Sequence, residues 1–568
     1  MSEPAQIQVP FSESDPDSAS NSARSRHMFP TLSAAQVARI TAHGEVRGVH
    51  AGEILFDVGE RHVPFLVVTA GRVDAARPTK GGETPVASHG PGGFTGDVNM
   101  LSGRPSLFRA RVVEDGEVIV LERGDLLSLV QTDDELGKIL LRAFILRRVE
   151  LVASGIGDAV LLGSDHCAGS LRIREFLTRN GHPYSYIDLD RDDGVQEMLD
   201  HFQISESDVP VVICRCEFVL RNPTNQEVAE CLGFNESVDR TQPRDLVVVG
   251  AGPAGLAAAV YAASEGLNVL VVETEAPGGQ AGSSSRIENY LGFPTGISGQ
   301  ELAGRAYTQA QKFGAQILIA RSAVKLECTS TPYRVQIDGG DEMSARAVII
   351  ATGAQYRRPD IAKLRGFEGA GVYYAATFME ARLCDDQEVV VIGGGNSAGQ
   401  AAVFLAQSAG HVHMLVRGSG LKDTMSRYLI RRIDDNPRID LRTDTELEYV
   451  DGAGHLERVG WRDRKTGEVE ECAVRHMFVM AGAAPTTAWL DGCLALDSNG
   501  FIKTGSDLTP LDLTTAGWPL GRPPYLLETS LPSVFAVGDV RSGNVKRVAS
   551  AVGEGSIAVA FVHRALND

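Results

Sequence analysis

Two glycine-rich turns are the parts of this sequence best suited to hold a charged ligand. The first, at residues 250–255, reads Gly-Ala-Gly-Pro-Ala-Gly, follows the apolar run 246–249 and precedes a helical stretch. Gly250 permits a tight turn, Gly252 lets the backbone approach a pyrophosphate, and Gly255 lets the helix pack close to the strand. The helix N-terminus then offers free N–H groups and a positive dipole end to the phosphates. The residues predicted to bind there are Gly250, Gly252, Pro253, Ala254 and Gly255.

An acidic residue stands where such a site needs one. Glu273 ends the next predicted strand, 269–272, at about the 20-residue spacing of dinucleotide sites. A carboxylate there accepts hydrogen bonds from both ribose hydroxyls. This unit therefore predicts the binding of an ADP whose ribose is unphosphorylated, as in FAD.

The second turn, at residues 393–398, reads Gly-Gly-Gly-Asn-Ser-Ala and is followed by an arginine at the equivalent place. The next predicted strand ends in Arg417, and Lys422 and Arg427 lie nearby. A carboxylate would repel a 2′-phosphate, whereas an arginine pairs with it, so we expect NADPH here. A solvated surface arginine is the alternative for Arg417. The residues predicted to bind NADPH are Gly393, Gly395, Asn396, Ser397, Ala398 and Arg417.

Two dinucleotide sites in one chain suggest electron transfer from a nicotinamide to a flavin. Residues 244–568 resemble the thioredoxin reductase family of FAD-dependent pyridine nucleotide oxidoreductases. Beyond the two turns, the motifs that carry the resemblance lie at 277–280, 287–290, 351–353, 534–539 and 547–549. The last of these begins a helix whose N-terminus faces the flavin in the family and can stabilise the reduced anion. The resemblance implies that FAD also contacts Gly279, Gln280, Asn289, Gly353, Gly538, Asp539, Arg547, Val548 and Ala549.

One family motif is missing from this sequence. Thioredoxin reductases carry a Cys-x-x-Cys shortly before the second glycine turn, and its two positions fall here on Ala376 and Met379. Cys384 is nearby but has no partner at a usable spacing. The resemblance implies an NADPH-dependent enzyme that passes electrons to a disulfide or small redox protein. Without the dithiol, either the redox thiols lie in another domain, or the flavin reduces another acceptor, as in a diaphorase or a ferredoxin–NADP reductase.

A thiol candidate lies upstream, in a segment that resembles a glutaredoxin or thioredoxin domain. Cys167 occupies the place of that fold's attacking cysteine, at a helix N-terminus whose dipole favours the thiolate. Pro210 matches the cis-proline beside that cysteine, whereas Ser170 replaces the second cysteine. Cys214 and Cys216 are candidates for resolving a disulfide with Cys167. We expect Cys167 to be catalytic, and the competing hypothesis is a thioredoxin fold retained as a spacer or docking module.

The N-terminal part resembles a cyclic-nucleotide-binding domain. Residues 91–97 are similar to its phosphate-binding cassette, with Asp97 in place of the usual glutamate. The arginine that pairs with the cyclic phosphate is replaced by Ser106, while Arg104 is out of register and Arg109 lies further on. Without a fixed cation the phosphate loses its strongest contact. We therefore expect a sensory or dimerising roll that binds no nucleotide, and a cyclic-nucleotide-gated redox sensor is the alternative.

The amino-acid composition limits the classes of protein to which this chain can belong. The net charge of −19 argues against a nucleic-acid surface, and 43% hydrophobic with 22% charged residues is typical of globular proteins. No apolar run approaches the roughly 20 residues that span a bilayer, and the polar N-terminus does not resemble a signal peptide. We expect a cytoplasmic protein whose eight cysteines are free thiols, with no metal site. The family resemblance also implies a possible homodimer.

The predicted fold is a multidomain chain with an N-terminal β-roll, an α/β thioredoxin-like domain and two Rossmann-like α/β domains. In the thioredoxin-like part, strands are expected at 159–162, 184–187 and 209–213, and helices at 171–179 and around 195–202. The predicted parts are a disordered tail (1–27), the roll (28–152), the thioredoxin-like domain (157–236), a split FAD-binding domain (244–365 and 497–568) and the NAD(P)-binding domain inserted in it (366–496).

Overall fold

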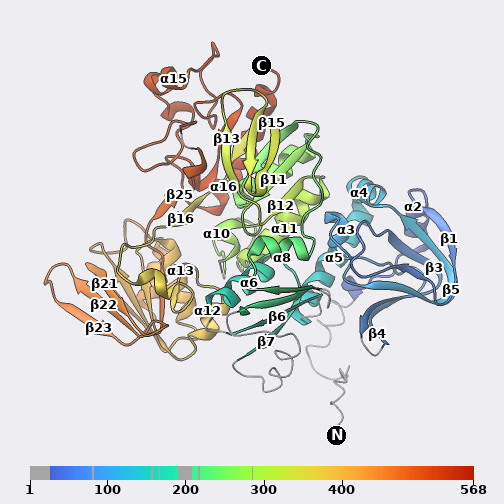
Figure 1. Cartoon of the computed structure of the whole chain (residues 1–568), viewed down its shortest axis with the longest axis horizontal. Coiled ribbons are helices and arrows are strands. Elements are labelled where there is room, and N and C mark those ends of the chain that lie inside the picture. The colour runs from blue at the N-terminus through green and yellow to red at the C-terminus, as the bar shows by residue number, and fades with distance from the viewer. Residues whose placement is uncertain are drawn as a thin grey trace, which may run out of the picture. The chain divides into compact units, whose positions relative to one another are not determined.

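The computed structural model divides the chain into two compact units, Met1–Ser154 and Gly155–Asp568. It describes residues 26–79, 82–154, 158–164, 167–189, 208–214, 218–284, 286–490 and 492–568 (Figure 1). Most of the tail predicted to be disordered lies outside the described residues, but residues 26–28 are helical. None of the helices in the described part of the chain combines the length and apolar character that crossing a membrane requires.

The first unit is an antiparallel β-roll closed by helices, as the sequence predicts. Its strands are ordered β1-β5-β3-β4, and β2 also pairs with β5. The core contains a cluster of three aromatic rings, those of Phe65, Phe94 and Phe144. The elements are α2 (Ala34–Thr41), β1 (Glu45–Val49), β2 (Ile54–Phe56), β3 (Phe65–Thr79), β4 (Gly82–His89), α3 (Asn99–Ser102), β5 (Arg109–Leu121), α4 (Arg123–Thr132) and α5 (Asp134–Ser154).

The second unit begins with a small mixed sheet of order β7-β6-β8-β9. Strands β6 and β7 are parallel, whereas β8 is antiparallel to both β6 and β9. The peptide bond between Val209 and Pro210, just before β8, is cis. The helix expected around 195–202 lies outside the described residues. The elements are β6 (Ala159–Gly163), α6 (Ala168–Arg179), β7 (Tyr184–Asp188), β8 (Val211–Cys214), β9 (Phe218–Arg221) and α8 (Asn225–Cys231).

A seven-stranded sheet follows, in the order β12-β11-β10-β15-β14-β13, and the late strand β26 joins it beside β15. The parallel strands of this sheet have largely apolar sequences, because both faces of this part are buried. These strands are β12, β11, β10, β15 and β26. The strands are β10 (Arg244–Val249), β11 (Val269–Glu273), β12 (Gln316–Ile319), β13 (Ala323–Glu327), β14 (Tyr333–Ile337), β15 (Asp341–Ile350) and β26 (Val534–Ala536). The main helices are α9 (Pro253–Ser264), α11 (Gly299–Lys312) and α16 (Val548–Ala565).

Between β15 and β26 the chain builds a second parallel sheet, of order β17-β24-β18-β19-β20. A three-stranded meander, β21 to β23, extends from it (Figure 1). The chain enters and leaves this part through the antiparallel pair β16 (Ala354–Tyr356) and β25 (Ala483–Pro485). The other elements are β17 (Val372–Tyr373), α12 (Phe378–Leu383), β18 (Glu388–Ile392), α13 (Asn396–Leu405), β19 (His411–Val416), α14 (Arg427–Asp434), β20 (Ile439–Thr443), β21 (Thr445–Asp451), β22 (Arg458–Asp463), β23 (Val469–Cys472) and β24 (His476–Val479).

The expectation that every cysteine is a free thiol is wrong for one pair. Cys328 and Cys493 form a disulfide, although they are 165 residues apart in sequence. Cys328 follows β13, and Cys493 follows a short 3₁₀ turn that packs against β13. Their Cα atoms are 5.9 Å apart, within the range that a disulfide spans. Cys167, Cys384 and Cys472 are free thiols, and Cys216 lies outside the described residues.

Candidate functional site

The first glycine turn has the geometry that its residue types predict. Gly250 has φ +104°, in the region that favours glycine. A Cβ built at Gly255 would overlap the carbonyl oxygen of Gly250, so α9 can start this close to β10 only with glycine there. The nearest atom to a Cβ built at Gly252 is the Cα of Gly279, at 4.0 Å. The backbone of Gly252 is therefore open to a ligand while the other two glycines fix the turn.

Glu273 stands at the end of β11 beside this turn, with 8% of its surface exposed. Its carboxylate accepts hydrogen bonds from the backbone N–H groups of Ala251 (2.6 Å) and Glu275 (2.9 Å). Burial raises the pKa of Glu273, and the two backbone hydrogen bonds oppose that effect. Glu273, which is predicted to bind a ribose, therefore also stabilises the backbone of the glycine turn.

Further predicted residues gather around the same turn. Gly279, with φ +51°, approaches Gly252 so closely that a Cβ on it would lie 3.1 Å from the Gly252 Cα. Gln280 donates a hydrogen bond from Nε2 to the carbonyl of Ala354, which ties this loop to the strand following Gly353. A Cβ on Gly538 would lie 3.0 Å from that of Ala254. Asn289 and Arg547 are exposed, and Val548 and Ala549 form the first turn of α16.

Glu554 on α16 is a residue that the sequence analysis missed. Its carboxylate accepts a hydrogen bond from the backbone N–H of Gly538 (2.7 Å), and it pairs with Arg541 (2.6 Å). Asn544 also donates to it. Glu554 therefore holds the turn that carries Asp539, whose own pKa is raised by burial. No local motif marks Glu554, since it is one acid in a long helix.

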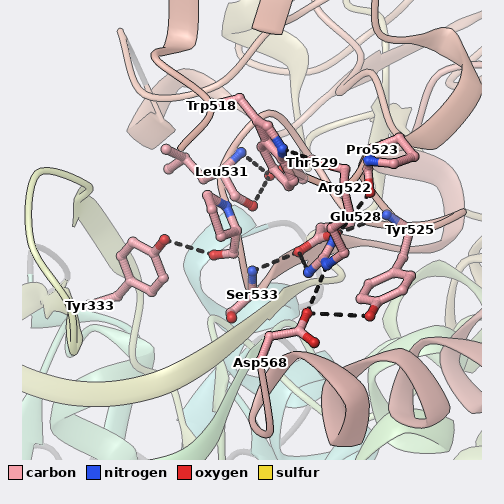
Figure 2. Close-up of polar contacts among 11 residues, drawn as sticks. Tyr333, Trp518, Arg522, Pro523, Tyr525, Glu528, Thr529, Leu531, Ser533 and Asp568 are labelled. Atoms are coloured by element: carbon pink, nitrogen blue, oxygen red, sulfur yellow. Dashed lines mark hydrogen bonds and ion pairs between the residues drawn. The ribbon is translucent and has the colours of Figure 1, made fainter. Parts of the chain in front are cut away.

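A second buried acid supports the strand that leads to this turn. Glu528 is fully buried, and Figure 2 shows its carboxylate facing the guanidinium of Arg522. The Arg522 Nη1 group donates to Glu528 at 2.7 Å, and the backbone N–H groups of Tyr525 (2.8 Å) and Ser533 (2.9 Å) donate to the same carboxylate. Arg522 also donates to the C-terminal residue Asp568 (2.7 Å). The network fixes the chain immediately before β26, which runs into Gly538.

The second glycine turn is built in the same way, at the end of β18. Gly393 has φ +142°, and a Cβ on it would lie 2.6 Å from the carbonyl oxygen of Met480. At Gly395 a Cβ would meet no described atom within 4 Å. Ala398, at the third position of the motif, is fully buried, whereas Ser397 is exposed.

Two hydrogen bonds bring a basic loop to this turn. The side-chain oxygen of Asn396 accepts from the Ser426 backbone N–H (2.8 Å), and the Thr424 hydroxyl donates to the Gly394 carbonyl (2.6 Å). This loop and the end of β19 carry three exposed basic side chains, those of Arg417, Lys422 and Arg427. The structure thus brings the predicted 2′-phosphate residues into the neighbourhood of the turn.

Comparisons with known proteins decide the family. The pattern of the family described as pyridine nucleotide-disulphide oxidoreductase matches residues 244–555. This chain belongs to the pyridine nucleotide-disulphide oxidoreductase family. The pattern of the cyclic nucleotide-binding domain matches residues 46–133, so the predicted N-terminal resemblance is confirmed as well.

Relatives of this oxidoreductase include many thioredoxin reductases. The one from Bacillus subtilis is 32% identical over 319 residues, covering 56% of this chain and 93% of its own. The NADPH-dependent thioredoxin reductase 3 of Arabidopsis thaliana is 30% identical, covering 61% of this chain and 65% of its own. Among solved structures, Lactococcus lactis thioredoxin reductase aligns with a TM-score of 0.51 and 28% identity, over 57% of this chain and 99% of its own.

In this oxidoreductase, the segment aligned with the dithiol of thioredoxin reductases has apolar surroundings. Ala376 is buried and belongs to the core of the second parallel sheet, directly before α12. Cys384 lies in the same core with no exposed surface, and burial raises its pKa well above the usual range. The side chain of Met379 is outside the described residues. Neither Ala376 nor the buried Cys384 thiol can exchange disulfides with a partner in solution.

Cys167 is placed at the start of α6, where it is the N-cap residue and is partly exposed. The cis-proline Pro210 lies against this helix start, since a Cβ on Gly169 would be 2.8 Å from the Pro210 ring. Ser170 is buried, and its hydroxyl accepts from the Ser164 backbone N–H (3.2 Å). Cys167 therefore combines partial exposure with a place at a helix N-terminus, as the attacking cysteine of a thioredoxin-like fold does.

The same helix start contacts the part of the oxidoreductase where the family keeps its dithiol. Leu171 of α6 packs against the apolar cluster that contains Ala376 and Cys384. A Cβ built at Gly369 would lie 2.7 Å from that of Ala168. The first turn of α6 is thus docked beside the segment that enters α12.

In the N-terminal unit, residues of the cassette are engaged with two arginines of α5. Asp97 pairs with Arg148 of α5 at 3.3 Å, and both side chains are largely buried. Arg147 donates to the carbonyls of Phe94 (3.1 Å) and Gly96 (2.8 Å). The Ser106 hydroxyl donates to the Phe108 carbonyl (2.8 Å). The acid that would contact a ribose therefore already has a cation as its partner.

Proposed function

We propose that this chain is an NADPH-dependent FAD oxidoreductase that reduces a disulfide or small redox protein. The observation that carries the proposal is the pair of open glycine turns, at Gly252 and Gly395, each at the C-terminal end of a parallel strand. Ligands of open α/β sheets bind at that edge. Membership of the oxidoreductase family and the names of the thioredoxin reductase relatives support the same function.

The residues around the first turn fit FAD. Gly252 and Gly279 leave backbone room for a pyrophosphate, and Glu273 is positioned to accept hydrogen bonds from the ribose. Asp539 is held at the turn where the family binds the ribityl chain. With FAD bound as in the family, the N-terminus of α16 would face the flavin ring. When bound, FAD supplies the chemistry that accepts hydride from NADPH and releases electrons to an acceptor.

The domain limits that we propose follow from the sheets. The FAD-binding domain comprises 244–365 and 497–568, because β26 returns to the sheet of β15. The NAD(P)-binding domain, 366–496, holds the second parallel sheet. The mixed sheet of order β7-β6-β8-β9 supports a thioredoxin-like domain at 157–236. The roll at 28–152 is a sensory or dimerising domain without nucleotide, supported by the Asp97–Arg148 pair. Heat of binding with cyclic AMP or cyclic GMP in calorimetry would contradict that role.

Flavin content and reduction test the core of the proposal. The purified protein should be yellow, and anaerobic NADPH should bleach the flavin absorbance stoichiometrically. A colourless protein that also fails to bind added FAD would refute the function.

Arg417 should determine the preference for NADPH. The Arg417→Ala variant should raise the KM for NADPH about 10–100-fold, because a charged hydrogen bond to phosphate contributes about 1.5–3 kcal/mol. Its KM for NADH should stay unchanged, since NADH has no 2′-phosphate. Arg431→Ala, on the exposed side of α14, is the matched control. Equal losses with both nucleotides would show that Arg417 is structural.

A variant of Cys167 should distinguish disulfide reduction from the alternative function, which is electron transfer to a dye or to ferredoxin. In the overall reaction, NADPH, one proton and a disulfide yield NADP⁺ and two thiols. The Cys167 thiolate would attack the disulfide, form a mixed disulfide with one half and release the other as a thiolate. Two electrons from NADPH would then reduce the mixed disulfide, which frees the second half and restores the Cys167 thiolate. The Cys167→Ser variant should lower disulfide reduction by more than about 100-fold, because the nucleophile is removed. Reduction of a dye by NADPH should be unaffected.

The matched control for this experiment is Cys231→Ser, another partly exposed cysteine. If the Cys167→Ser variant keeps its disulfide reductase activity, the thiol is not the exchanging group. A diaphorase or ferredoxin–NADP reductase activity, which the loss of the dithiol at Ala376 and Met379 favours, would show dye or ferredoxin reduction without disulfide reduction in the unmodified protein.

A further inference from the structure

Three metal-binding side chains converge at the edge of the second parallel sheet. Glu388 is the first residue of β18, His413 lies in β19, and Cys472 ends β23 of the meander. The Cys472 thiol donates to Glu388 Oε2 at 3.2 Å, and His413 Nε2 lies 3.1 Å from the same oxygen. The sulfur is 3.9 Å from His413 Nε2. A carboxylate, an imidazole and a thiol thus direct one ligand atom each toward a common point.

We propose that Glu388, His413 and Cys472 bind a divalent metal ion of the zinc class. Zn–S bonds of about 2.3 Å and Zn–N or Zn–O bonds of about 2.0–2.2 Å place tetrahedral ligand atoms about 3.4–3.6 Å apart. The three observed separations differ from these values by only about 0.3–0.4 Å. Thiolate and imidazole select borderline-soft metals, whereas Mg²⁺ and Ca²⁺ prefer all-oxygen sites. Three protein ligands leave the fourth position to water.

The surroundings of His413 favour a metal ligand over a solvated histidine. His413 has 8% of its surface exposed, and its second ring nitrogen, Nδ1, is buried without a hydrogen-bond partner among the described residues. Asp440 Oδ2 stands 3.7 Å from that nitrogen, and Arg442 holds Asp440 at 2.7 Å. Metal-bound histidines typically donate their second N–H to such a carboxylate, which fixes the ring. A shift of Asp440 by less than 1 Å completes that arrangement.

The other groups facing the cluster are compatible with a bound cation. The ring of His411 lies 4.7 Å from that of His413, and Trp461 covers the imidazole at 5.4 Å. The charge of Arg442 is compensated by Asp440 and by Glu470. Burial and the Glu388 carboxylate raise the pKa of Cys472 to about 11. The thiol is therefore protonated without metal, and a metal ion must displace that proton when it binds.

The position of the cluster separates it from the nucleotide site. Glu388 begins β18 and Gly393 follows its end, so a rise of about 3.3 Å per residue places them about 16 Å apart. A metal ion here would join β23 to β18 and β19, and would fasten the meander to the sheet. The proposed site therefore does not depend on the flavin or on the identity of the electron acceptor.

Cobalt substitution tests the site in the full-length protein. The chelator-treated protein is titrated with Co²⁺, and difference spectra are recorded against the same protein without Co²⁺, so that the flavin absorbance cancels. We expect one equivalent of Co²⁺ to produce the intense ligand-field bands of a tetrahedral site, together with a sulfur-to-cobalt charge-transfer band. Zn²⁺ should abolish both signals and raise the midpoint of thermal unfolding.

Variants distinguish the site from unspecific binding. Cys472→Ser should remove the charge-transfer band, and His413→Asn should remove stoichiometric binding, while Cys231→Ser and His455→Asn serve as controls. Asp440→Asn should weaken Co²⁺ affinity about 10–100-fold without removing the charge-transfer band, as expected for a group that only positions His413. The proposal is overturned if the protein shows no tetrahedral cobalt spectrum, or if Cys472→Ser binds Co²⁺ with an unchanged spectrum.

Discussion

The Gly255→Ala variant is expected to be purified as a folded but largely colourless protein. The added methyl group would overlap the carbonyl oxygen of Gly250, and it would also lie 3.2 Å from the Ala351 side chain. The atom that the methyl group meets belongs to the backbone and cannot rotate away. The whole of α9 must therefore move away from β10. Overpacking of this kind costs about 1–3 kcal/mol even where neighbours can shift, which corresponds to about 5–150-fold in affinity. Because the displaced helix start is the pyrophosphate site, we expect FAD affinity to fall by about 100-fold.

The ratio of flavin to protein absorbance and a titration with FAD measure this loss. Gly304→Ala is the matched control, because Gly304 lies inside α11 and a Cβ there meets no described atom within 4 Å. That substitution should leave flavin binding intact and stabilise the protein by up to about 1 kcal/mol. Full flavin occupancy in Gly255→Ala would mean that the first turn is not the FAD site.

The glycine turns were predictable because their signal is local. Gly250 and Gly393 need positive φ, Gly255 needs close packing, and each requirement involves residues within one strand-turn-helix unit. The apolar runs before the turns follow from burial on both faces of a parallel sheet. The alternation of strands and helices also predicted α6 and the strands on either side of it, with no end more than three residues from its observed position.

What the sequence could not predict depends on contacts between distant segments. The disulfide between Cys328 and Cys493 and the cluster around His413 each join strands that become neighbours only in the folded sheets. Glu528 and Glu554 were missed for the same reason, since a buried acid looks like a surface acid until its partners are known. The prediction that no metal site exists stays untested, and a site built from three separate strands, as proposed for Glu388, His413 and Cys472, leaves no local motif in the sequence.

The positions of the thiols can be compared directly between the sequence and the structure. Ala376 and Met379 stand at the two positions of the family's dithiol, and Ala376 and Cys384 are buried in an apolar core. The start of α6, with Cys167, is docked beside this same segment through Leu171. A thiol supplied by the upstream domain would therefore stand next to the place from which the dithiol was lost. This geometry makes Cys167 the more promising of the free thiols for exchange.

Replacing Glu528 by alanine is expected to reduce the stability of the second unit by about 3–5 kcal/mol, the usual cost of removing one partner of a buried ion pair. The substitution leaves Arg522 facing a buried space, with only 22% of its side chain exposed. It also removes the acceptor of the Tyr525 and Ser533 backbone N–H groups, which have no other acceptor in this network. Since Ser533 directly precedes β26, the loss should loosen the strand that carries the Gly538 turn.

Urea denaturation followed by circular dichroism, with flavin retention as a second readout, measures the effect. Glu342→Ala is the matched control, because Glu342 pairs with Arg334 across exposed strand positions, with 43% of its side chain accessible. Such a surface pair contributes about 0–1 kcal/mol. Glu528→Gln should fall between the two, since it keeps the shape but turns an amide nitrogen toward groups that donate. If Glu528→Ala were no more destabilising than Glu342→Ala, the Arg522–Glu528 pair would contribute no more than a surface ion pair. The support of β26 would then have to come from its backbone pairing with β15 and with residues 527–529.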